Sequence, residues 1–253
     1  MAKDKRRLDQ LLVERGMAES RTQAQALIIS GNVFSGQRRL EKPGQTVPAD
    51  VPVTVRGRAH PWVSRGGIKL AHGLDHFAID PGGFVCLDVG ASTGGFTHVL
   101  LTRGAARVYA VDVGHGQLAW TLRQDPRVIV LERTNARALG REHVAEAVDL
   151  IVCDVSFIGL ETALPAPLAL TAAQAWLVAL IKPQFEAGRA QVRKGGVVRD
   201  PAVREAVCGR LVGWLSSRPG WTVIGTTESP VKGPEGNVEY LIAARKERGD
   251  RGE

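Results

Sequence analysis

Two lysines and two acids stand where apolar segments of the chain begin or end, so their side chains could act together in chemistry. Asp154 ends one apolar segment and Lys182 ends the next. Lys69 lies ahead of the first such segment, and Glu239 begins the last. Charged groups beside buried strands are costly unless they are paired. The four residues therefore form either a structural ion-pair network or, beside a ligand, a site that orients reactants and moves a proton.

A second chemical feature is the stretch from Gly83 to Thr97, an apolar run that ends in Asp88 and a cluster of small residues. Its glycines let the backbone turn sharply and approach a ligand closely. A plain turn between a strand and a helix has the same composition. However, Asp112 ends the next apolar segment, where it could accept hydrogen bonds from ribose hydroxyls. The stretch thus predicts a nucleotide-type ligand.

The spacing of the glycines bears on which cofactor this loop would hold. Gly90-Ala-Ser-Thr-Gly94-Gly95 lacks the middle glycine of a dinucleotide fingerprint, although NAD remains an alternative. With Asp88 two residues ahead of Gly90, the pattern resembles an S-adenosylmethionine loop, whose acidic start lies beside the amino-acid end of the cofactor. Asn135 would reach the adenine or act only as a turn residue. The predicted cofactor-binding residues are Asp88, Gly90, Ser92, Thr93, Gly94, Gly95, Phe96, Asp112 and Asn135.

The elements that position these residues follow from alternating apolar and helical segments. Strands are expected at 84–89, 107–113, 128–132, 150–154, 176–182, 221–226 and 238–244, and a helix carrying Lys69 at 68–77. The alternation predicts an α/β fold with a doubly wound, mostly parallel, Rossmann-like sheet. The short loop before the last strand predicts an antiparallel final strand. All four charged residues would then meet at one edge of the sheet.

Residues 1–60 have a different composition and predict a small α+β domain. They contain 11 Lys/Arg and 6 Asp/Glu, a net charge of +5 out of +7 for the chain, so this segment is the expected contact for a polyanion. Helices are predicted at 7–15 and from the N-cap Ser20 to 31, followed by short strands at 32–37 and 46–55. A Pro- and Gly-containing linker is expected at 61–67, a catalytic domain at 68–245, and a disordered tail at 246–253.

This N-terminal segment resembles a known RNA-binding domain. The segments that carry the resemblance are Arg7-Leu-Asp-Gln-Leu-Leu-Val-Glu-Arg-Gly, Ser20-Arg-Thr-Gln-Ala, Ile28-Ile-Ser-Gly-Asn-Val and Lys42-Pro-Gly. They are similar to the domain shared by ribosomal small-subunit protein four and many pseudouridine synthases. The resemblance implies RNA contacts by Arg6, Arg7, Arg21 and Lys42. In the linker, Arg65 is a further expected RNA contact, because it directly precedes the helix that carries Lys69.

Other classes of protein are disfavoured by composition. No apolar segment reaches the roughly 18 uninterrupted residues of a membrane span, and the N-terminus does not resemble an export signal. Cys86, Cys153 and Cys208 have no metal-ligand spacing, so we expect buried structural thiols and no metal site. The expected location is the cytoplasm, with no membrane contact and no obligate protein partner.

Longer motifs across both segments resemble one family, and no position of the charged tetrad is replaced in them. The tetrad order resembles the FtsJ class of ribose 2′-O-methyltransferases. The longer motifs resemble the TlyA family, which often carries a haemolysin label. They are Val63-Ser-Arg-Gly-Gly-x-Lys69, Asp88-Val-Gly-Ala-Ser-Thr-Gly-Gly-Phe-Thr, Thr134-Asn-Ala-Arg137, Asp154-Val-Ser-Phe-Ile, Lys182-Pro-Gln-Phe-Glu, Gly196-Val-Val-Arg-Asp200 and Ser229-Pro-x-x-Gly-x-x-Gly-Asn-x-Glu239.

The resemblance implies methylation of a cytidine ribose in ribosomal RNA, with S-adenosylmethionine as the methyl donor and ribosomal subunits as partners. Lys182 would be the general base, oriented with Lys69 by Asp154 and Glu239, and Lys69 would hold the attacking hydroxyl. A cytolysin, a catalytically inert ribosome-binding module and an NAD-dependent enzyme are the alternatives. The modified nucleotide, the ribosomal subunit and the oligomeric state do not follow from the sequence.

Overall fold

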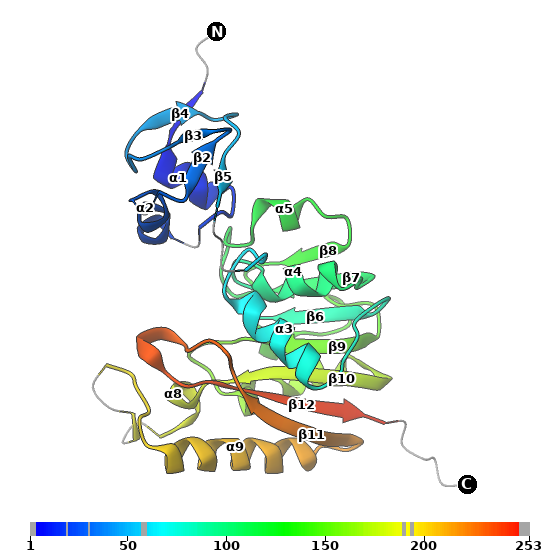
Figure 1. Cartoon of the computed structure of the whole chain (residues 1–253). Helices are drawn as coiled ribbons and strands as arrows, with labels where there is room; N and C mark the ends of the chain where they lie inside the picture. The colour runs from blue at the N-terminus through cyan, green and yellow to red at the C-terminus, as the bar shows by residue number, and fades with distance from the viewer. Residues whose placement is uncertain are drawn as a thin grey trace.

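The computed structural model of the chain describes residues 4–18, 20–29, 31–56, 60–188, 191–192 and 195–247. The described residues up to 56 form a small N-terminal module, and those from 66 onward form a larger C-terminal domain beside it (Figure 1). Helix α5 (Trp120–Arg123) of the C-terminal domain is the helix nearest to the N-terminal module (Figure 1). No helix in these described ranges has the length and apolar character needed to cross a bilayer.

The N-terminal module packs two helices against two small antiparallel sheets. Helix α1 (Leu8–Glu14) and helix α2 (Arg21–Ile29) contribute Leu8, Leu12 and Ile28 to its core. The hydroxyl of Ser20 accepts a hydrogen bond from the amide of Gln23 at 3.2 Å, which confirms the predicted N-cap. The strands are β1 (Lys5–Arg7), β2 (Val33–Ser35), β3 (Arg38–Arg39), β4 (Thr46–Pro48) and β5 (Thr54–Val55).

Two predictions for this module need correction. Arg7 does not lie on the first helix, because residues 5–7 pair as β1 with β4 and helix α1 begins only at Leu8. The expected strand at 46–55 is two strands in different sheets: β4 pairs with β1, and β5 pairs with β2. The intervening residues include Pro52, which has no N–H group for a continuous ladder.

The C-terminal domain is built on a seven-stranded sheet in the order β11-β12-β10-β9-β6-β7-β8. The pairings from β10 to β8 are parallel, whereas β12 runs antiparallel to both of its neighbours. The predicted fold class and antiparallel final strand are confirmed. The strands are β6 (Val85–Val89), β7 (Arg107–Val111), β8 (Val128–Leu131), β9 (Val148–Cys153), β10 (Thr171–Ile181), β11 (Trp221–Glu228) and β12 (Tyr240–Lys246).

Helices cover both faces of this sheet, as a doubly wound fold requires. The first face is covered by α3 (Gly66–His76), α4 (Gly95–Thr102) and α5. The second is covered by η1 (Ala136–Ala138), α6 (Leu160–Ala163), α7 (Pro165–Ala169) and α9 (Pro201–Ser216). The short helix α8 (Pro183–Glu186) follows β10, and the short helix η3 (Pro234–Gly236) precedes β12. Cys86 and Cys153 are buried in strands, as expected.

Several predicted boundaries differ from the structure. Helix α3 begins at Gly66, so the two glycines assigned to the linker belong to its first turn. Gly67 is required there by packing, since a Cβ on this residue would lie 2.3 Å from Cγ of Trp62. Strand β10 begins five residues before the predicted start, and β12 includes Lys246, which was assigned to the tail. Residues 248–253 of the predicted tail lie outside the described residues.

Candidate active site

The four charged residues of the predicted tetrad form two ion pairs in the structure. The ammonium nitrogen of Lys69 lies 2.6 Å from Oε2 of Glu239, although 170 positions separate the two residues in the chain. The ammonium nitrogen of Lys182 lies 2.5 Å from Oδ1 of Asp154. Lys69, Lys182 and Glu239 are buried, and the side chain of Asp154 is 20% exposed. Each buried charge therefore has an opposite charge in contact, which offsets the cost of its desolvation.

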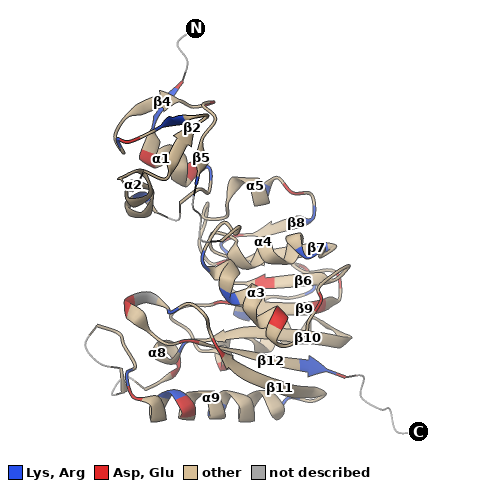
Figure 2. Ribbon diagram, viewed as in Figure 1, with Lys and Arg blue, Asp and Glu red and all other residues tan. Residues whose placement is uncertain are grey.

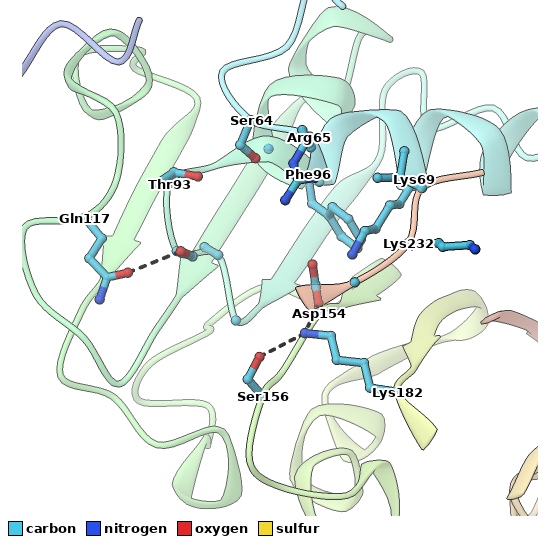
Figure 3. A pocket seen from close by; sticks show the side chains of 17 residues that line it. Ser64, Arg65, Lys69, Thr93, Phe96, Gln117, Asp154, Ser156, Lys182 and Lys232 are labelled. Carbon is cyan, nitrogen blue, oxygen red and sulfur yellow. Dashed lines mark hydrogen bonds and ion pairs between the residues drawn. The ribbon is translucent and has the colours of Figure 1, made fainter. Parts of the chain in front are cut away.

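Each member of the tetrad comes from a different element. Asp154 follows β9 and Lys182 follows β10, and these neighbouring strands are parallel, so both residues emerge at the same edge. Glu239 reaches that edge because it directly precedes β12, which runs in the opposite direction. Lys69 extends from the buried side of α3. Figure 3 shows Asp154 beside the ammonium group of Lys182.

Two further residues hold the tetrad in place. Ser156 accepts a hydrogen bond from Nζ of Lys182 at 2.9 Å (Figure 3). Gln184 donates a hydrogen bond to Oε1 of Glu239 at 3.2 Å, so both oxygens of this carboxylate are engaged. Gly233 leaves room for Glu239, because a Cβ at this position would lie 2.1 Å from Oε1. The geometry at these four side chains is thus fixed from several elements.

The predicted cofactor loop follows β6 and approaches the end of β9 closely. At Gly90 the backbone φ is 85°, and a Cβ there would lie 2.7 Å from the carbonyl oxygen of Asp154. Gly94 has a φ of 92° and directly precedes α4. These glycines serve the turn and the close approach that the sequence predicted. Between them, Ser92 also adopts a positive φ of 47° and donates its backbone N–H to Oδ2 of Asp112 at 2.8 Å.

Asp88 is fully buried behind this loop rather than exposed at its surface. Its Oδ2 accepts hydrogen bonds from the amide of Thr97 at 2.9 Å and from the hydroxyl of Thr97 at 2.6 Å. Its Oδ1 is buried and accepts no hydrogen bond within the described residues. Burial raises the pKa of Asp88 to about 7, although the Thr97 hydrogen bonds act in the opposite direction. Asp88 lines neither of the two cavities at this edge, so the structure does not bring it to the surface where the sequence predicted a cofactor contact.

Asp112 and Asn135 line one cavity of about 460 Å³, which we call the Asn135 cavity. Asp112 also accepts a hydrogen bond from the amide of Gly114 at 2.7 Å, so its carboxylate already orders two loops. Asn135 caps η1 by accepting a hydrogen bond from the amide of Arg137. Apolar walls come from Val113 and Phe157, both of which are exposed. The cavity combines these apolar faces with many polar side chains, among them Asp112 and Asn135.

A second cavity of about 420 Å³, the lysine cavity, contains the tetrad lysines. Lys69 and Lys182 line it together with the predicted loop residues Thr93 and Phe96. Asp154 lines both cavities, as do Gly90, Ser92, Gln117 and Ser156. The two cavities therefore meet at the cofactor loop and at Asp154, forming a bipartite site.

The predicted RNA contacts lie mostly outside this site. Arg65 is exposed and lines the lysine cavity, whereas Arg6 and Lys42 are exposed on the N-terminal module. Arg7 and Arg21 both bind the buried carboxylate of Asp9, at 3.0 Å and 3.1 Å. The hydrogen bond from Arg7 is the largest influence that holds the pKa of Asp9 well below its usual range. Figure 2 shows basic residues on the strands of the module and acidic residues on α1.

Sequence reasoning missed several residues of the site. Ser156 lies two residues after Asp154, and that spacing at a strand end was the available signal. Gln184 lies two residues after Lys182 in the same way. Gln117 lines both cavities and accepts a hydrogen bond from Ser92, but it lies in an irregular loop that carries no pattern. A polar residue in a loop has no periodicity that would mark it.

Comparisons with known families match both parts of the chain. Residues 62–246 match the FtsJ-like methyltransferase family, and residues 6–52 match the S4 domain. The first of these matches spans the whole tetrad and both cavities. The chain is therefore an enzyme of the methyltransferase class with an N-terminal S4 domain.

Individual relatives are similar over nearly the whole chain. The 16S/23S rRNA (cytidine-2′-O)-methyltransferase TlyA of Mycobacterium tuberculosis (strain CDC 1551 / Oshkosh) is 51% identical, covering 94% of this chain and 89% of the relative. Hemolysin A of Brachyspira hyodysenteriae is 41% identical over 93% of this chain and 98% of the relative. A solved structure of a hemolysin-named protein from Streptococcus thermophilus has a TM-score of 0.74 and 38% identity, covering 97% of this chain and 90% of that chain. The chain belongs to the TlyA family of FtsJ-like methyltransferases.

Proposed function

We propose that this protein transfers a methyl group from S-adenosylmethionine to the ribose 2′-hydroxyl of a cytidine in ribosomal RNA. The observation that carries the proposal is the meeting of Lys69, Asp154, Lys182 and Glu239 at one end of the sheet, directly beside the cofactor loop. The TlyA protein of M. tuberculosis, which is named for this reaction on 16S and 23S rRNA, supports the choice of substrate.

The residues around the loop fit S-adenosylmethionine. Gly90 provides the close backbone approach, and the Asn135 cavity offers apolar walls for an adenine. Asp112 would accept from the ribose hydroxyls, and Asp88 would act from behind the loop by binding Thr97 at the start of α4. When bound, this cofactor supplies a methyl group on a positively charged sulfur, which is already reactive. The protein therefore needs mainly to align the hydroxyl and remove its proton.

The tetrad supplies these two functions. Lys182, with its nitrogen between Asp154 and Ser156, would accept the proton of the 2′-hydroxyl after passing one of its own protons to the carboxylate. Lys69 would donate a hydrogen bond to the same hydroxyl oxygen and stabilise the negative charge that develops there. Glu239 keeps Lys69 in position through its 2.6 Å contact. Both lysines would thus act on one oxygen atom.

The S4 domain would deliver the RNA. Arg6, Arg7, Arg21 and Lys42 would contact phosphates from the N-terminal module, and Arg65 would do so at the mouth of the lysine cavity. Phosphate contacts of this kind fix register and orientation. A ribosomal substrate also places the working enzyme in the cytoplasm.

The test is transfer of tritiated methyl groups from S-adenosylmethionine to isolated ribosomal subunits, followed by mapping of the labelled nucleotide. We expect label on the 2′-oxygen of a cytidine. Absence of transfer to either subunit and to free ribosomal RNA would contradict the proposal.

The alternatives make different predictions in simple assays. A cytolysin would lyse red cells as a purified protein with no nucleic acid present. An inert ribosome-binding module would show no heat of binding with S-adenosylmethionine, even with RNA added. An NAD-dependent enzyme would bind NAD in the same titration.

A further inference from the structure

The cleft between the N-terminal module and the C-terminal domain is a third hollow, distinct from the two cavities of the active site. We propose that this interdomain cleft holds a nucleotide of the substrate RNA, next to the target, with its base stacked on Trp120. The inference rests on the proposed function for the identity of the target. It adds a contact surface that the tetrad and the cofactor loop do not provide.

The cleft has a volume of about 630 Å³ and receives residues from both domains. Gln10, Val13 and Arg21 line it from the N-terminal module, and Trp120 and Arg123 from α5. Its volume lies within the range of small-molecule sites, so it accommodates a nucleotide.

Trp120 is the residue that indicates the class of ligand. Its side chain is 60% exposed, although it begins a helix whose other apolar residue, Leu122, is buried in the core. An indole left open to solvent in a cleft is a flat surface on which any base can stack. Unpaired RNA bases are recognised in this way, by stacking on aromatic side chains.

One arginine of the cleft is placed to contact a phosphate. Arg21 remains 53% exposed while Asp9 holds one of its nitrogens, so it is fixed in direction but open to a phosphate. Arg123 is paired with Glu132 behind the cleft. Among the described lining residues, Glu14 is acidic. Asp9 therefore orients Arg21 while leaving it open, whereas both terminal nitrogens of Arg123 are bonded to Glu132.

The cleft also continues into the active site. Thr93 lines both the cleft and the lysine cavity, and Gln117 lines the cleft and both cavities. The carbonyl of Thr93 accepts a hydrogen bond from the amide of Ala119, next to Trp120. If the target ribose lies at Lys182, the RNA chain would therefore extend along Thr93 and Gln117, and a nucleotide next to the target would lie against Trp120.

Substitution at Trp120 tests this surface. For Trp120→Ala we expect the KM for isolated ribosomal subunits to rise roughly tenfold or more, the loss of one stacked base. The affinity for S-adenosylmethionine, measured by calorimetry, should be unchanged. Trp120→Phe keeps an aromatic face and should restore most of the loss. Ile224→Ala, at another exposed apolar position on the edge strand β11, is the control and should leave the KM unchanged.

Cross-linking separates this proposal from the proposed function. Ribosomal RNA containing 4-thiouridine should cross-link to the peptide that carries Trp120, whether or not methyl transfer is detected. If the wild-type protein cross-links there but transfers no methyl group, the cleft binds RNA and the proposed reaction is wrong. An unchanged KM in Trp120→Ala, or cross-links only outside the cleft, would overturn the proposal. Loss of self-association in the variant, without an effect on RNA, would assign the cleft to a second copy of the chain instead.

Discussion

At the scale of single residues, the site depends on how charges are paired inside the fold. Lys182 contacts Asp154, and Lys69 contacts Glu239, so the two lysines share no carboxylate. Each lysine can therefore be substituted without breaking the ion pair of the other. The distinction between the two roles is therefore open to substitution at each position.

Lys182→Met should abolish most methyl transfer while leaving binding intact. Methionine keeps much of the apolar length of the side chain but cannot accept a proton, so we expect kcat to fall by about 10²- to 10⁴-fold. Calorimetry with S-adenosylmethionine and filter binding of ribosomal subunits should give affinities close to wild type. Lys246→Met is the matched control, because Lys246 lies at the opposite end of the β10–β12 pair. A normal methylation rate in Lys182→Met would show that Lys182 is not the general base.

Asp88 should make stability depend on pH in a recognisable direction. Its pKa is about 7 in the folded protein, compared with about 3.9 in an unfolded chain. Between these values the folded state holds a proton that the unfolded state has released, so the free energy of unfolding falls as pH rises from about 4 to about 7. Asp88→Asn removes this dependence.

Melting temperatures measured from pH 5 to pH 8 test the effect. The melting temperature of Asp88→Asn, minus that of the wild type, should increase as pH rises. Asp80→Asn alters an exposed carboxylate, and its difference from wild type should stay constant. A constant difference for Asp88→Asn as well would show that burial does not raise the pKa of this carboxyl.

At the scale of elements, the start of α3 connects the linker to the active site. Gly67 packs against Trp62, and a Cβ on Gly95, at the start of α4, would lie 2.2 Å from Oγ of Ser64. The ring of Trp62 also meets His98 of α4 edge to face, at 5.7 Å between centroids. The two helices that carry Lys69 and the end of the cofactor loop are thus packed through glycines and the linker.

Gly67→Ala should destabilise the protein, because its new Cβ would overlap Trp62. We expect a loss of about 1–3 kcal/mol in the free energy of unfolding, as for other overpacked sites. Gly209→Ala is the control, since this glycine is exposed in the middle of α9 with open space around it. That change should stabilise the helix by about 0.5–1 kcal/mol. Urea denaturation measures the free energy of unfolding of both variants. Equal changes in the two would contradict the packing argument.

At the scale of the whole molecule, the two domains touch through small residues. A Cβ on Gly16 of the N-terminal module would lie 3.1 Å from Cβ of Ala119 in the C-terminal domain. Ala119 also donates a hydrogen bond to the carbonyl of Thr93 in the cofactor loop. This contact between the two domains is therefore one hydrogen bond away from the candidate cofactor loop.

Gly16→Asn should disturb this contact, and Gly36→Asn should not. Both glycines have positive φ angles, 64° and 59°, which asparagine tolerates, but Gly36 has open space around it. We expect kcat/KM for ribosomal subunits to fall about tenfold in Gly16→Asn, equivalent to about 1.4 kcal/mol. Small-angle scattering should show a changed domain arrangement in that variant alone. Equal activities in the two variants would show that the contact does not matter for the RNA substrate.

The sequence by itself determined the sheet and the edge at which its charged residues gather. Apolar runs of strand length, separated by helical segments, specify a parallel sheet, and a short final loop specifies an antiparallel return. Those two features are enough to bring Asp154, Lys182 and Glu239 to one edge. They depend on local patterns, which a single sequence displays directly.

Only the tertiary structure decided which groups touch. The pairing of Lys69 with Glu239 depends on the angle at which α3 packs on the sheet, and no local pattern encodes that angle. Arg7 was assigned to a helix because its neighbours have helical spacing, but pairing with a strand some forty residues away overrides that preference. The interdomain cleft likewise depends on where the two domains meet, with Gly16 and Ala119 among the residues at that meeting. Contacts between distant segments are set by packing of the whole chain, and so is a strand such as β1, whereas the apolar runs of the C-terminal sheet can be recognised in the local sequence.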